Sequence, residues 1–252
     1  MAPRLRTFFV AVVLSVYLLI VGPPGLLVAW LIGSARLLYA LTVSAARFGM
    51  WAAGVRIDVR GLERLDERQN YLFMPNHSSN VDPPVVVAAL RRDVRMMGKA
   101  SLFRIPIFGW VIRLAGFVPV IREDRDAAIE SGNQAAKLLR QGLDFAIFPE
   151  GTRSRDGNLL PLKKGPFFIA QAGGVPVVPV RVRGTREVMK KGGKVIYPGS
   201  VEVEVCRPID VAGLEGDDES IRERLRTRVA DELRGDLTRP ERRVTPQGHE
   251  RA

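Results

Sequence analysis

After residue 54 the chain repeats one pattern, in which short apolar runs of strand length alternate with longer stretches of helical periodicity. The expected strands are 55–59, 71–74, 94–97, 117–121, 144–148, 175–182 and 201–205. The expected helices are 83–90, 127–139, 165–172 and 217–233. Strands that alternate with helices predict an α/β fold with a mixed, mostly parallel sheet flanked by helices. No internal repeat or second-domain linker is evident.

The first 53 residues are strongly apolar and predict helices instead. The apolar stretches are 8–21, 26–32 and 37–53. As a helix, the first of them is about 21 Å long, too short to cross a hydrocarbon core of roughly 30 Å unaided. We therefore expect a hydrophobic helical membrane anchor at 1–53, an α/β domain at 54–236 and a disordered, polar tail at 237–252.

Two arrangements of this anchor are open. Residues 8–32 could span the membrane once with a kink at Pro23-Pro24, or two helices could hinge at these prolines and lie in one leaflet. Arginines near both ends, such as Arg6 and Arg36, favour the second arrangement, because neither end then carries charge across the membrane. A cleaved signal peptide fits less well, since the apolar run has no clear small-residue cleavage site. A buried pair of amphipathic helices is the remaining alternative.

The charge balance favours an anionic partner. The 252 residues carry a formal net charge of +11 and the pI is about 10.5, which suits nucleic acid, a membrane surface or a phosphorylated substrate. A nucleic-acid-binding module would interleave aromatic with basic residues. Aromatic residues make up only 7% of the chain, and several lie in the expected anchor, so we expect a membrane surface and no nucleic acid.

The chain has two histidines and one cysteine, which narrows its possible chemistry. A single cysteine excludes an intrachain disulfide, and Cys206 ends an alternating run typical of a strand, where a structural thiol is expected rather than a nucleophile. So few histidines and cysteines make a Cys/His zinc site implausible. Because His249 lies in the polar tail, histidine base chemistry would have to use His77.

His77 follows the apolar run 71–74, and Asp82 follows it five positions later. Neutral imidazole accepts a proton near neutral pH, and a nearby carboxylate can hold its tautomer and stabilise the imidazolium. The pair lies where a strand gives way to a helix, with Asp82 or Asn80 as the expected cap; open α/β sheets often bind ligands at such places. On this pair alone, a base with its orienting carboxylate and a histidine satisfied locally by Ser78 or Asn80 are both open.

The block 148–154, Phe-Pro-Glu-Gly-Thr-Arg-Ser, also follows an expected strand. Gly151 permits close backbone approach, Thr152 offers a hydroxyl, and Arg153 can grip a phosphate with two parallel hydrogen bonds. Glu150 suits an anion site only if it orients Arg153 or receives a substrate hydroxyl. The alternative is an ordinary charged turn.

Two further segments carry weaker signals. Arg122 emerges at the end of the run 116–122, where Glu123 and Asp124 could pair with it. Pro179 stands between two valines in an expected strand and predicts an edge strand or a bulge there.

Together these segments resemble the glycerolipid acyltransferase family, and within it the 1-acylglycerol-3-phosphate (lysophosphatidic acid) acyltransferases. His77 and Asp82 match the family's histidine, four residues, aspartate block, and 148–154 matches its third block in full. The run 116–122 is similar to the second block and 178–180 to the fourth. The stretch 99–110 is similar to the segment between the first two blocks, so the resemblance covers about residues 55–210.

The resemblance implies transfer of a fatty acyl group from a thioester to a glycerophospholipid hydroxyl. His77 would take the proton of the hydroxyl, and Asp82 would fix the ring and stabilise its charge. The positions implied for the acceptor phosphate and its pocket are Lys99, Arg122, Glu150, Gly151, Thr152 and Arg153. It implies no metal and no cofactor, with acyl-coenzyme A or acyl-carrier protein as co-substrate.

The implied partners are a lysophospholipid acceptor, the acyl donor and an anionic membrane surface, at the cytoplasmic face of the cell membrane. The apolar stretch 105–117 could line the acyl chain, face the membrane or pack in the core. Within the family, glycerol 3-phosphate or another lysolipid is the alternative acceptor. In other classes, a catalytically silent membrane scaffold and a basic membrane-surface or nucleic-acid-binding protein are alternatives.

Overall fold

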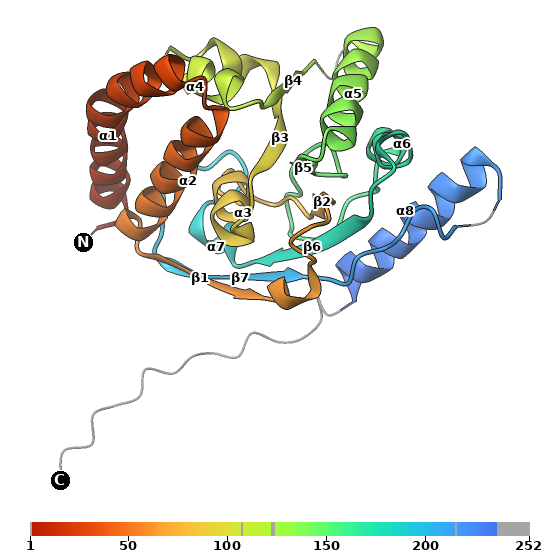
Figure 1. Ribbon diagram of the computed structural model, residues 1–252. Coiled ribbons are helices and arrows are strands. Elements are labelled where there is room, and N and C mark those ends of the chain that lie inside the picture. The colour runs from red at the N-terminus through yellow and green to blue at the C-terminus, as the bar shows by residue number, and fades with distance from the viewer. Residues whose placement is uncertain (1, 107, 122–123, 215, 236–252) are drawn as a thin grey trace.

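The computed structural model describes residues 2–106, 108–121, 124–214 and 216–235, which form a sheet flanked by helices (Figure 1). In this part of the chain the sheet has seven strands in the order β1-β7-β6-β2-β5-β3-β4. The strands are β1 (Val55–Arg60), β2 (Leu72–Pro75), β3 (Val94–Lys99), β4 (Val118–Val120), β5 (Asp144–Ala146), β6 (Val177–Arg183) and β7 (Gly199–Val205). All neighbouring strands are parallel except β6 and β7, which confirms the predicted mixed, mostly parallel sheet.

Helices cover both faces of the sheet, because its central strands are apolar on both sides. In β2, Phe73 packs on one face against α2 (Ala35–Ala52) and α3 (Asp82–Leu90). Leu72 and Met74 pack on the other face against α5 (Arg125–Arg140), α6 (Lys164–Gly173) and α8 (Asp218–Arg234). The remaining helices are α1 (Pro3–Ile32), α4 (Phe108–Leu114), α7 (Thr185–Val188) and the 3-10 turns η1 (Leu62–Arg64) and η2 (Ala100–Arg104).

The amino-terminal residues form a helical hairpin, but its turn is not where the prolines predicted it. α1 runs through Pro23-Pro24 without a break, and the chain reverses at Gly33 and Ser34. Gly33 has a φ of +64°, a conformation that glycine adopts readily, and the Ser34 hydroxyl caps α2 by accepting from the Leu37 N–H at 3.3 Å. These stop and start signals therefore decide where the first helix ends.

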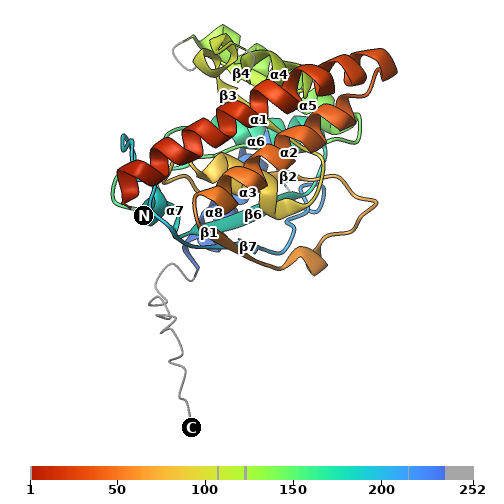
Figure 2. The ribbon, with the colours of Figure 1, turned by 90° about the vertical axis from the view of Figure 1, so that its left-hand side faces the viewer.

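α1 and α2 lie side by side, and α2 packs between α1 and α3 (Figure 2). Residues 3–29 of α1 are long and apolar enough to cross a membrane, judged by length and composition only, with a mean hydropathy of 2.2 and only 6% buried. A buried helical pair would hide that surface, so this alternative does not fit the structure. Spanning once and lying in one leaflet both remain predictions.

The prediction that Pro179 lies in an edge strand was wrong, because β6 lies between β7 and β2. The alternative, a bulge, fits the pairing beside it: Pro179 faces Cys206 and Val177 faces Ile209, so the segment after β7 has one extra residue. The Pro179 carbonyl accepts from the Cys206 N–H at 3.0 Å, so this side of the residue faces β7 just beyond its last residue, Val205. In an extended strand the nitrogen points the same way as the carbonyl of its own residue. Proline has no N–H to return this bond, so the pair of Pro179 and Cys206 has one backbone hydrogen bond instead of two.

Candidate active site

The loop that carries His77 leaves the centre of the sheet at the end of β2. Asn76 continues the pairing with β6 through its side chain: its Nδ2 donates to the Val182 carbonyl at 2.9 Å, and the Val182 N–H donates to its Oδ1 at 2.7 Å. This exchange replaces the next backbone pair of the ladder. It holds the chain against β6 up to the residue before His77.

His77 and Asp82 are brought together as the sequence predicted. Nδ1 of His77 lies 2.7 Å from Oδ2 of Asp82, and the same oxygen accepts the N–H groups of Ser78 and Ser79 at 2.7 Å each. Asp82 is fully buried, whereas 11% of the His77 side chain is exposed. With Nδ1 engaged, Nε2 is the ring nitrogen left to accept a proton.

The expected cap of α3 was wrong. Val81 is the N-cap residue and has no capping side-chain bond, while Asp82 is the first helical residue. Its carboxylate turns back toward the preceding loop and accepts from Ser78 and Ser79. A negative charge in the first turn also suits the positive end of the helix dipole, so one side chain stabilises the start of α3 and orients the histidine.

The block 148–154 lies beside this loop because β5 pairs with β2. The ring of Phe148 stacks on the imidazole of His77, with centroids 4.0 Å apart and planes inclined by 24°. The Ser154 N–H donates to the His77 carbonyl at 2.7 Å. Ring and backbone of His77 are therefore both held by a segment more than seventy residues away in the sequence.

Glu150 is held between two backbone segments. It is 1% exposed; its Oε1 accepts the His77 N–H at 2.6 Å and its Oε2 accepts the Leu160 N–H at 2.8 Å. Burial raises the pKa of this carboxyl to about 7, against the opposing effect of the two hydrogen bonds. The two partners considered from the sequence, Arg153 and a substrate hydroxyl, are thus replaced by backbone N–H groups.

Gly151, Thr152 and Arg153 lie nearer the surface than Glu150. Gly151 has a φ of +66°, and a Cβ there would lie 3.3 Å from Cγ of Lys163, so only glycine fits this turn without strain. The Thr152 residue is exposed. The guanidinium of Arg153 hydrogen-bonds the side-chain oxygen of Asn80, which places this cation over the loop that carries His77.

The two other predicted phosphate ligands are not tied to this cluster. Lys99 ends β3 and is exposed, with β5 between its strand and β2. Arg122 lies outside the described residues. The predicted fourth block, 178–180, lies in β6 beside β2, where Val178 and Val180 pack in the core.

Comparisons with known proteins identify the family. A family model described as Acyltransferase matches residues 56–183, half of the chain. The chain belongs to the acyltransferase family. It is 30% identical over 201 residues to the 1-acyl-sn-glycerol-3-phosphate acyltransferase of Borreliella burgdorferi, a match covering 79% of this chain and 80% of that protein.

One further relative matches a smaller share of this chain, and one solved structure matches a larger share. A chloroplastic 1-acyl-sn-glycerol-3-phosphate acyltransferase of Brassica napus is 35% identical over 61% of this chain. This chain matches only 45% of that relative's length. The crystal structure of the 1-acyl-sn-glycerophosphate (LPA) acyltransferase PlsC from Thermotoga maritima superposes with a TM-score of 0.82 at 26% identity, covering 94% of this chain and 97% of that one.

Three residues that contact the candidate site, Thr185, Met189 and Lys191, belong to no motif in the sequence. The Ser79 hydroxyl donates to the Met189 carbonyl at 2.6 Å, the Ser78 and Thr185 hydroxyls lie 3.2 Å apart, and Lys191 Nζ donates to the Arg153 carbonyl at 2.6 Å. All three contacts come from α7 and the loop after it. The signal for them in the sequence was the basic run 186–191 after the expected strand 175–182. Such a run is equally typical of an ordinary solvated surface.

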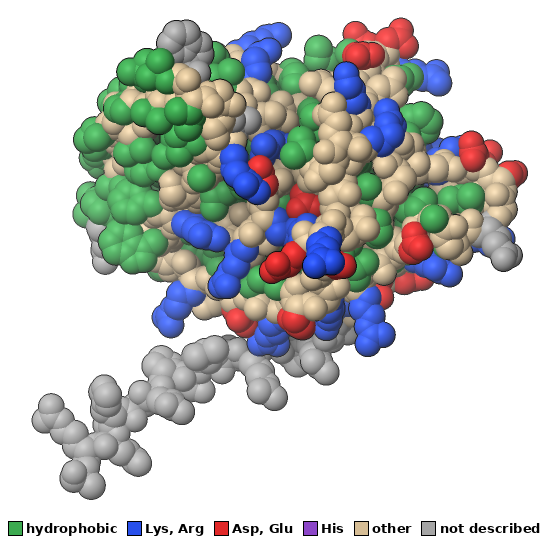
Figure 3. Space-filling view, in the orientation of Figure 1, with side chains coloured by type: hydrophobic (Ala, Val, Ile, Leu, Met, Phe, Trp, Pro, Cys, Tyr) green, Lys and Arg blue, Asp and Glu red, His purple; other side chains and the backbone are tan. Residues whose placement is uncertain are grey.

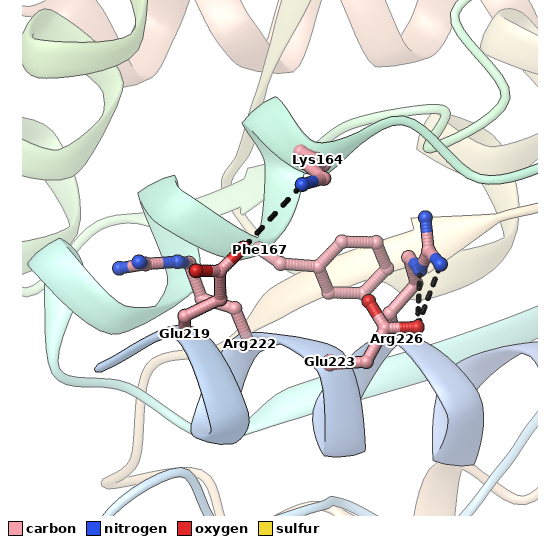
Figure 4. A pocket seen from close by; sticks show the side chains of 6 residues that line it. All are labelled: Lys164, Phe167, Glu219, Arg222, Glu223 and Arg226. Atoms are coloured by element: carbon pink, nitrogen blue, oxygen red, sulfur yellow. Dashed lines mark hydrogen bonds and ion pairs between the residues drawn. The ribbon is translucent and has the colours of Figure 1, made fainter. Parts of the chain in front are cut away.

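A small hollow between α6 and α8 is lined by Phe167 and five charged side chains, four of which form ion pairs (Figure 4). Its volume is about 30 Å³, near that of one water molecule. Lys164 and Glu219 lie 3.6 Å apart and Arg226 and Glu223 lie 2.6 Å apart. Elsewhere in the described ranges, no three His, Cys, Asp or Glu side chains gather as a metal site requires.

Proposed function

We propose that the protein is a 1-acylglycerol-3-phosphate acyltransferase. It moves a fatty acyl group from acyl-coenzyme A or acyl-carrier protein to the sn-2 hydroxyl of 1-acylglycerol 3-phosphate, giving phosphatidic acid in phospholipid biosynthesis. The observation that carries this proposal is the 2.7 Å contact between His77 Nδ1 and Asp82, which leaves Nε2 as a base. Relatives that are 1-acyl-sn-glycerol-3-phosphate acyltransferases support the choice of substrate.

The chemistry requires one base and no covalent intermediate. Nε2 of His77 removes the proton of the acceptor hydroxyl while its oxygen attacks the thioester carbonyl, and Asp82 stabilises the imidazolium. When the tetrahedral intermediate collapses, the C–S bond breaks and the imidazolium returns its proton to the leaving thiolate. Cys206 is unsuited to act as a nucleophile, because burial raises the pKa of its thiol to about 12.

The acceptor phosphate is the remaining anion to place. Arg153 is our first choice, since its guanidinium lies over the loop of His77 and its partner there, Asn80, is uncharged. Lys99, Arg122 and the Thr152 hydroxyl complete the proposed phosphate site, and Gly151 lets the backbone approach the acceptor. We assign Glu150 a positioning role, because both its oxygens hold backbone N–H groups.

The substrate is a lipid, so the site must reach a bilayer. The exposed apolar surface of α1 supports membrane association, and a net charge of +11 suits an anionic surface. We place the protein at the cytoplasmic face of the cell membrane, where acyl-coenzyme A and acyl-carrier protein are found. The reaction as written uses no metal or other cofactor.

The test offers the purified protein acyl-coenzyme A with lysophosphatidic acid, glycerol 3-phosphate or neutral lysolipids. We expect lysophosphatidic acid to be preferred and His77→Ala to abolish turnover. His249→Ala replaces the other histidine and should keep full activity. Unchanged activity in His77→Ala would overturn the mechanism, whereas preference for another acceptor would overturn only the choice of substrate.

A further inference from the structure

A groove of about 1350 Å³ lies between α2, the carboxyl end of α3 and the edge strand β1. It is separate from the catalytic centre. On α3 the lining residues begin at Val87, five residues after Asp82 and about 7.5 Å farther along the helix axis. None of the residues proposed for catalysis or for the acceptor phosphate lines the groove.

The floor of the groove is apolar. It includes Val43 and Met50 from α2, Ile57 and Val59 from β1, and Val87 from α3. The lining residues of α2 extend from 36 to 51, a rise of about 22 Å. That length exceeds the depth of one leaflet, about half of a hydrocarbon core of roughly 30 Å, so an extended acyl chain fits along the floor.

Three arginines at the rim have no carboxylate partner among the described residues. Arg47 donates to the Ala88 carbonyl at 3.2 Å, while the side chains of Arg36 and Arg91 make no described hydrogen bond or ion pair. Two of the lining carboxylates are already used, because Asp144 pairs with Arg92 and Asp93 with Arg95. Only Glu67 is left to oppose these arginines.

The three arginines approach one end of α3. Arg47 reaches Ala88, Arg91 caps the helix, and Arg36 is one helical turn before Tyr39, whose hydroxyl donates to the Arg92 carbonyl at 2.7 Å. A helix carboxyl end carries only about half a negative charge. Neutralising α3 therefore accounts for one of these arginines at most, and a positive excess remains.

The backbone at Arg91 is a second sign that this end of the groove is specialised. Arg91 has a φ of 52° and is the one non-glycine residue with a positive φ in the described part of the chain. Glycine is the usual residue in this conformation at a helix end. An arginine here accepts local strain and adds a cation to the rim.

The groove adjoins the apolar surface of the hairpin. α2 forms one wall and packs on α1, whose surface is exposed and apolar. Figure 3 shows apolar side chains gathered over α1 and α2, with Lys and Arg side chains bordering them toward α3 and β1. A cationic rim, an apolar floor and a neighbouring lipid-seeking surface match the chemistry of one kind of ligand.

We propose that this groove binds one anionic phospholipid, with its phosphate held by Arg36, Arg47 and Arg91 and an acyl chain along the apolar floor. The bound lipid is neither the acceptor nor the acyl donor at His77. It fixes the hairpin against the α/β domain and makes attachment depend on the anionic lipid content of the membrane. The proposal does not depend on the reaction at His77.

The first measurement is flotation of the full-length protein with phosphatidylcholine vesicles, with or without phosphatidylglycerol. The variant Arg36→Gln/Arg91→Gln should bind the anionic vesicles about ten-fold more weakly or worse, and bind pure phosphatidylcholine as before. The control Arg224→Gln/Arg228→Gln removes the same charge from exposed positions on α8 and should keep wild-type binding. Equal loss in both variants would overturn the proposal, because general electrostatics would then account for it.

The second measurement separates a seated lipid from attraction to the surface. Ala40 is exposed and lines the groove, so Ala40→Trp fills it without changing charge or burying a clash in the core. Native mass spectrometry of protein purified in detergent should find phosphatidylglycerol on the wild type and lose it in Ala40→Trp. Retention of the lipid would overturn the proposal.

Inorganic phosphate is the matching soluble probe. It should not raise the Tm of the wild type as added phosphatidylglycerol does. A rise of the same size would mean that only the phosphate is recognised, which would also overturn the proposal. All three experiments measure lipid binding or stability and none measures acyl transfer. Failure of this proposal is therefore distinguishable from failure of the acyltransferase assignment.

Discussion

His77 is held from three sides: Asp82 at its ring nitrogen, Phe148 on its ring face and Glu150 at its backbone N–H. Asp82 fixes the tautomer of the ring, Phe148 fixes its tilt and Glu150 fixes the position of the backbone. In the proposed mechanism, a base held in this way needs little reorganisation as the substrate reacts. Of the three, only Asp82 is bonded directly to a ring nitrogen.

Asp82→Asn should lower kcat by about 10⁴-fold and leave the KM for the acceptor nearly unchanged, because the amide can retain the hydrogen bonds but cannot stabilise the imidazolium or fix the tautomer. Steady-state kinetics with lysophosphatidic acid measures both constants. Asp231→Asn, an exposed carboxylate on α8, is the control and should match the wild type. A loss confined to KM would contradict the role of Asp82.

Glu150→Gln should destabilise the fold by about 1–3 kcal/mol, because the amide nitrogen would face one of two backbone donors. The pKa of Glu150 is raised to about 7, so the folded protein holds this proton where the unfolded chain has lost it. The stability from this group is therefore full below pH 4.5 and is lost as the pH rises through about 7.

The variant does not titrate, so its stability deficit should be greatest near pH 5 and should shrink toward pH 8, by at most about 1.4 kcal/mol per pH unit. Thermal unfolding of both proteins in the same mild detergent across this range measures it. The other titrating groups are common to both and cancel. A deficit that stays constant with pH would show that Glu150 keeps its charge throughout.

At the scale of elements, α7 and the loop after it join parts of the site that the motifs leave separate. Ser79 bonds Met189, and Lys191 bonds the carbonyl of Arg153. The same loop reaches the amino-terminal hairpin, since the Ile196 N–H donates to the Thr7 hydroxyl at 2.9 Å. One short segment thus contacts the loop that carries His77, the block 148–154 and α1.

Lys191→Ala should raise the KM for lysophosphatidic acid several-fold with a smaller effect on kcat, because the turn that presents Arg153 loses its anchor while His77 keeps its partners. Acceptor titrations at saturating acyl-coenzyme A measure the two constants. Lys190→Ala is the matched control, since Lys190 is exposed and makes no side-chain contact in the described ranges. An equal rise in both variants would assign the effect to surface charge instead.

The sequence predicted the strands and the pairing of His77 with Asp82, because alternating apolar residues and a short spacing are local signals. It did not predict the partners of Glu150 or the central place of Pro179. These depend on which strands become neighbours: Glu150 reaches His77 because β5 pairs with β2, and Pro179 lies inside the sheet because β6 pairs with both β2 and β7. The turn at Gly33 was missed because the two prolines gave a stronger local signal.

At the scale of the whole molecule, charge and apolar surface gather on the side of the helical hairpin. Leu19 and Ile20 are 62% and 65% exposed on α1, although leaving both in water forgoes several kcal/mol of burial. A bilayer would supply that burial. This arrangement accounts for a long apolar helix with little of its surface covered by protein.

Leu19→Asp/Ile20→Asp should weaken binding to vesicles by well over ten-fold, because a carboxylate in the hydrocarbon costs about 2.5–3.5 kcal/mol. The fold should persist, as neither side chain is buried. Ile129→Asp on α5, where Ile129 is 49% exposed, controls for loss of an exposed apolar residue elsewhere. Vesicle flotation with a parallel melting curve compares them, and equal weakening by both would argue against a membrane role for α1.

The sheet order has a consequence for how the protein is made. β2, which leads into His77, lies between β5 and β6, and β1 is held only by β7. The first strands to leave the ribosome therefore wait for the last ones, and their separation along the chain makes this assembly slow. A chain halted before β6 can already pair β2 with β5, but it lacks the strand to which the Asn76 side chain is bonded, and β1 has no neighbouring strand until β7 is made.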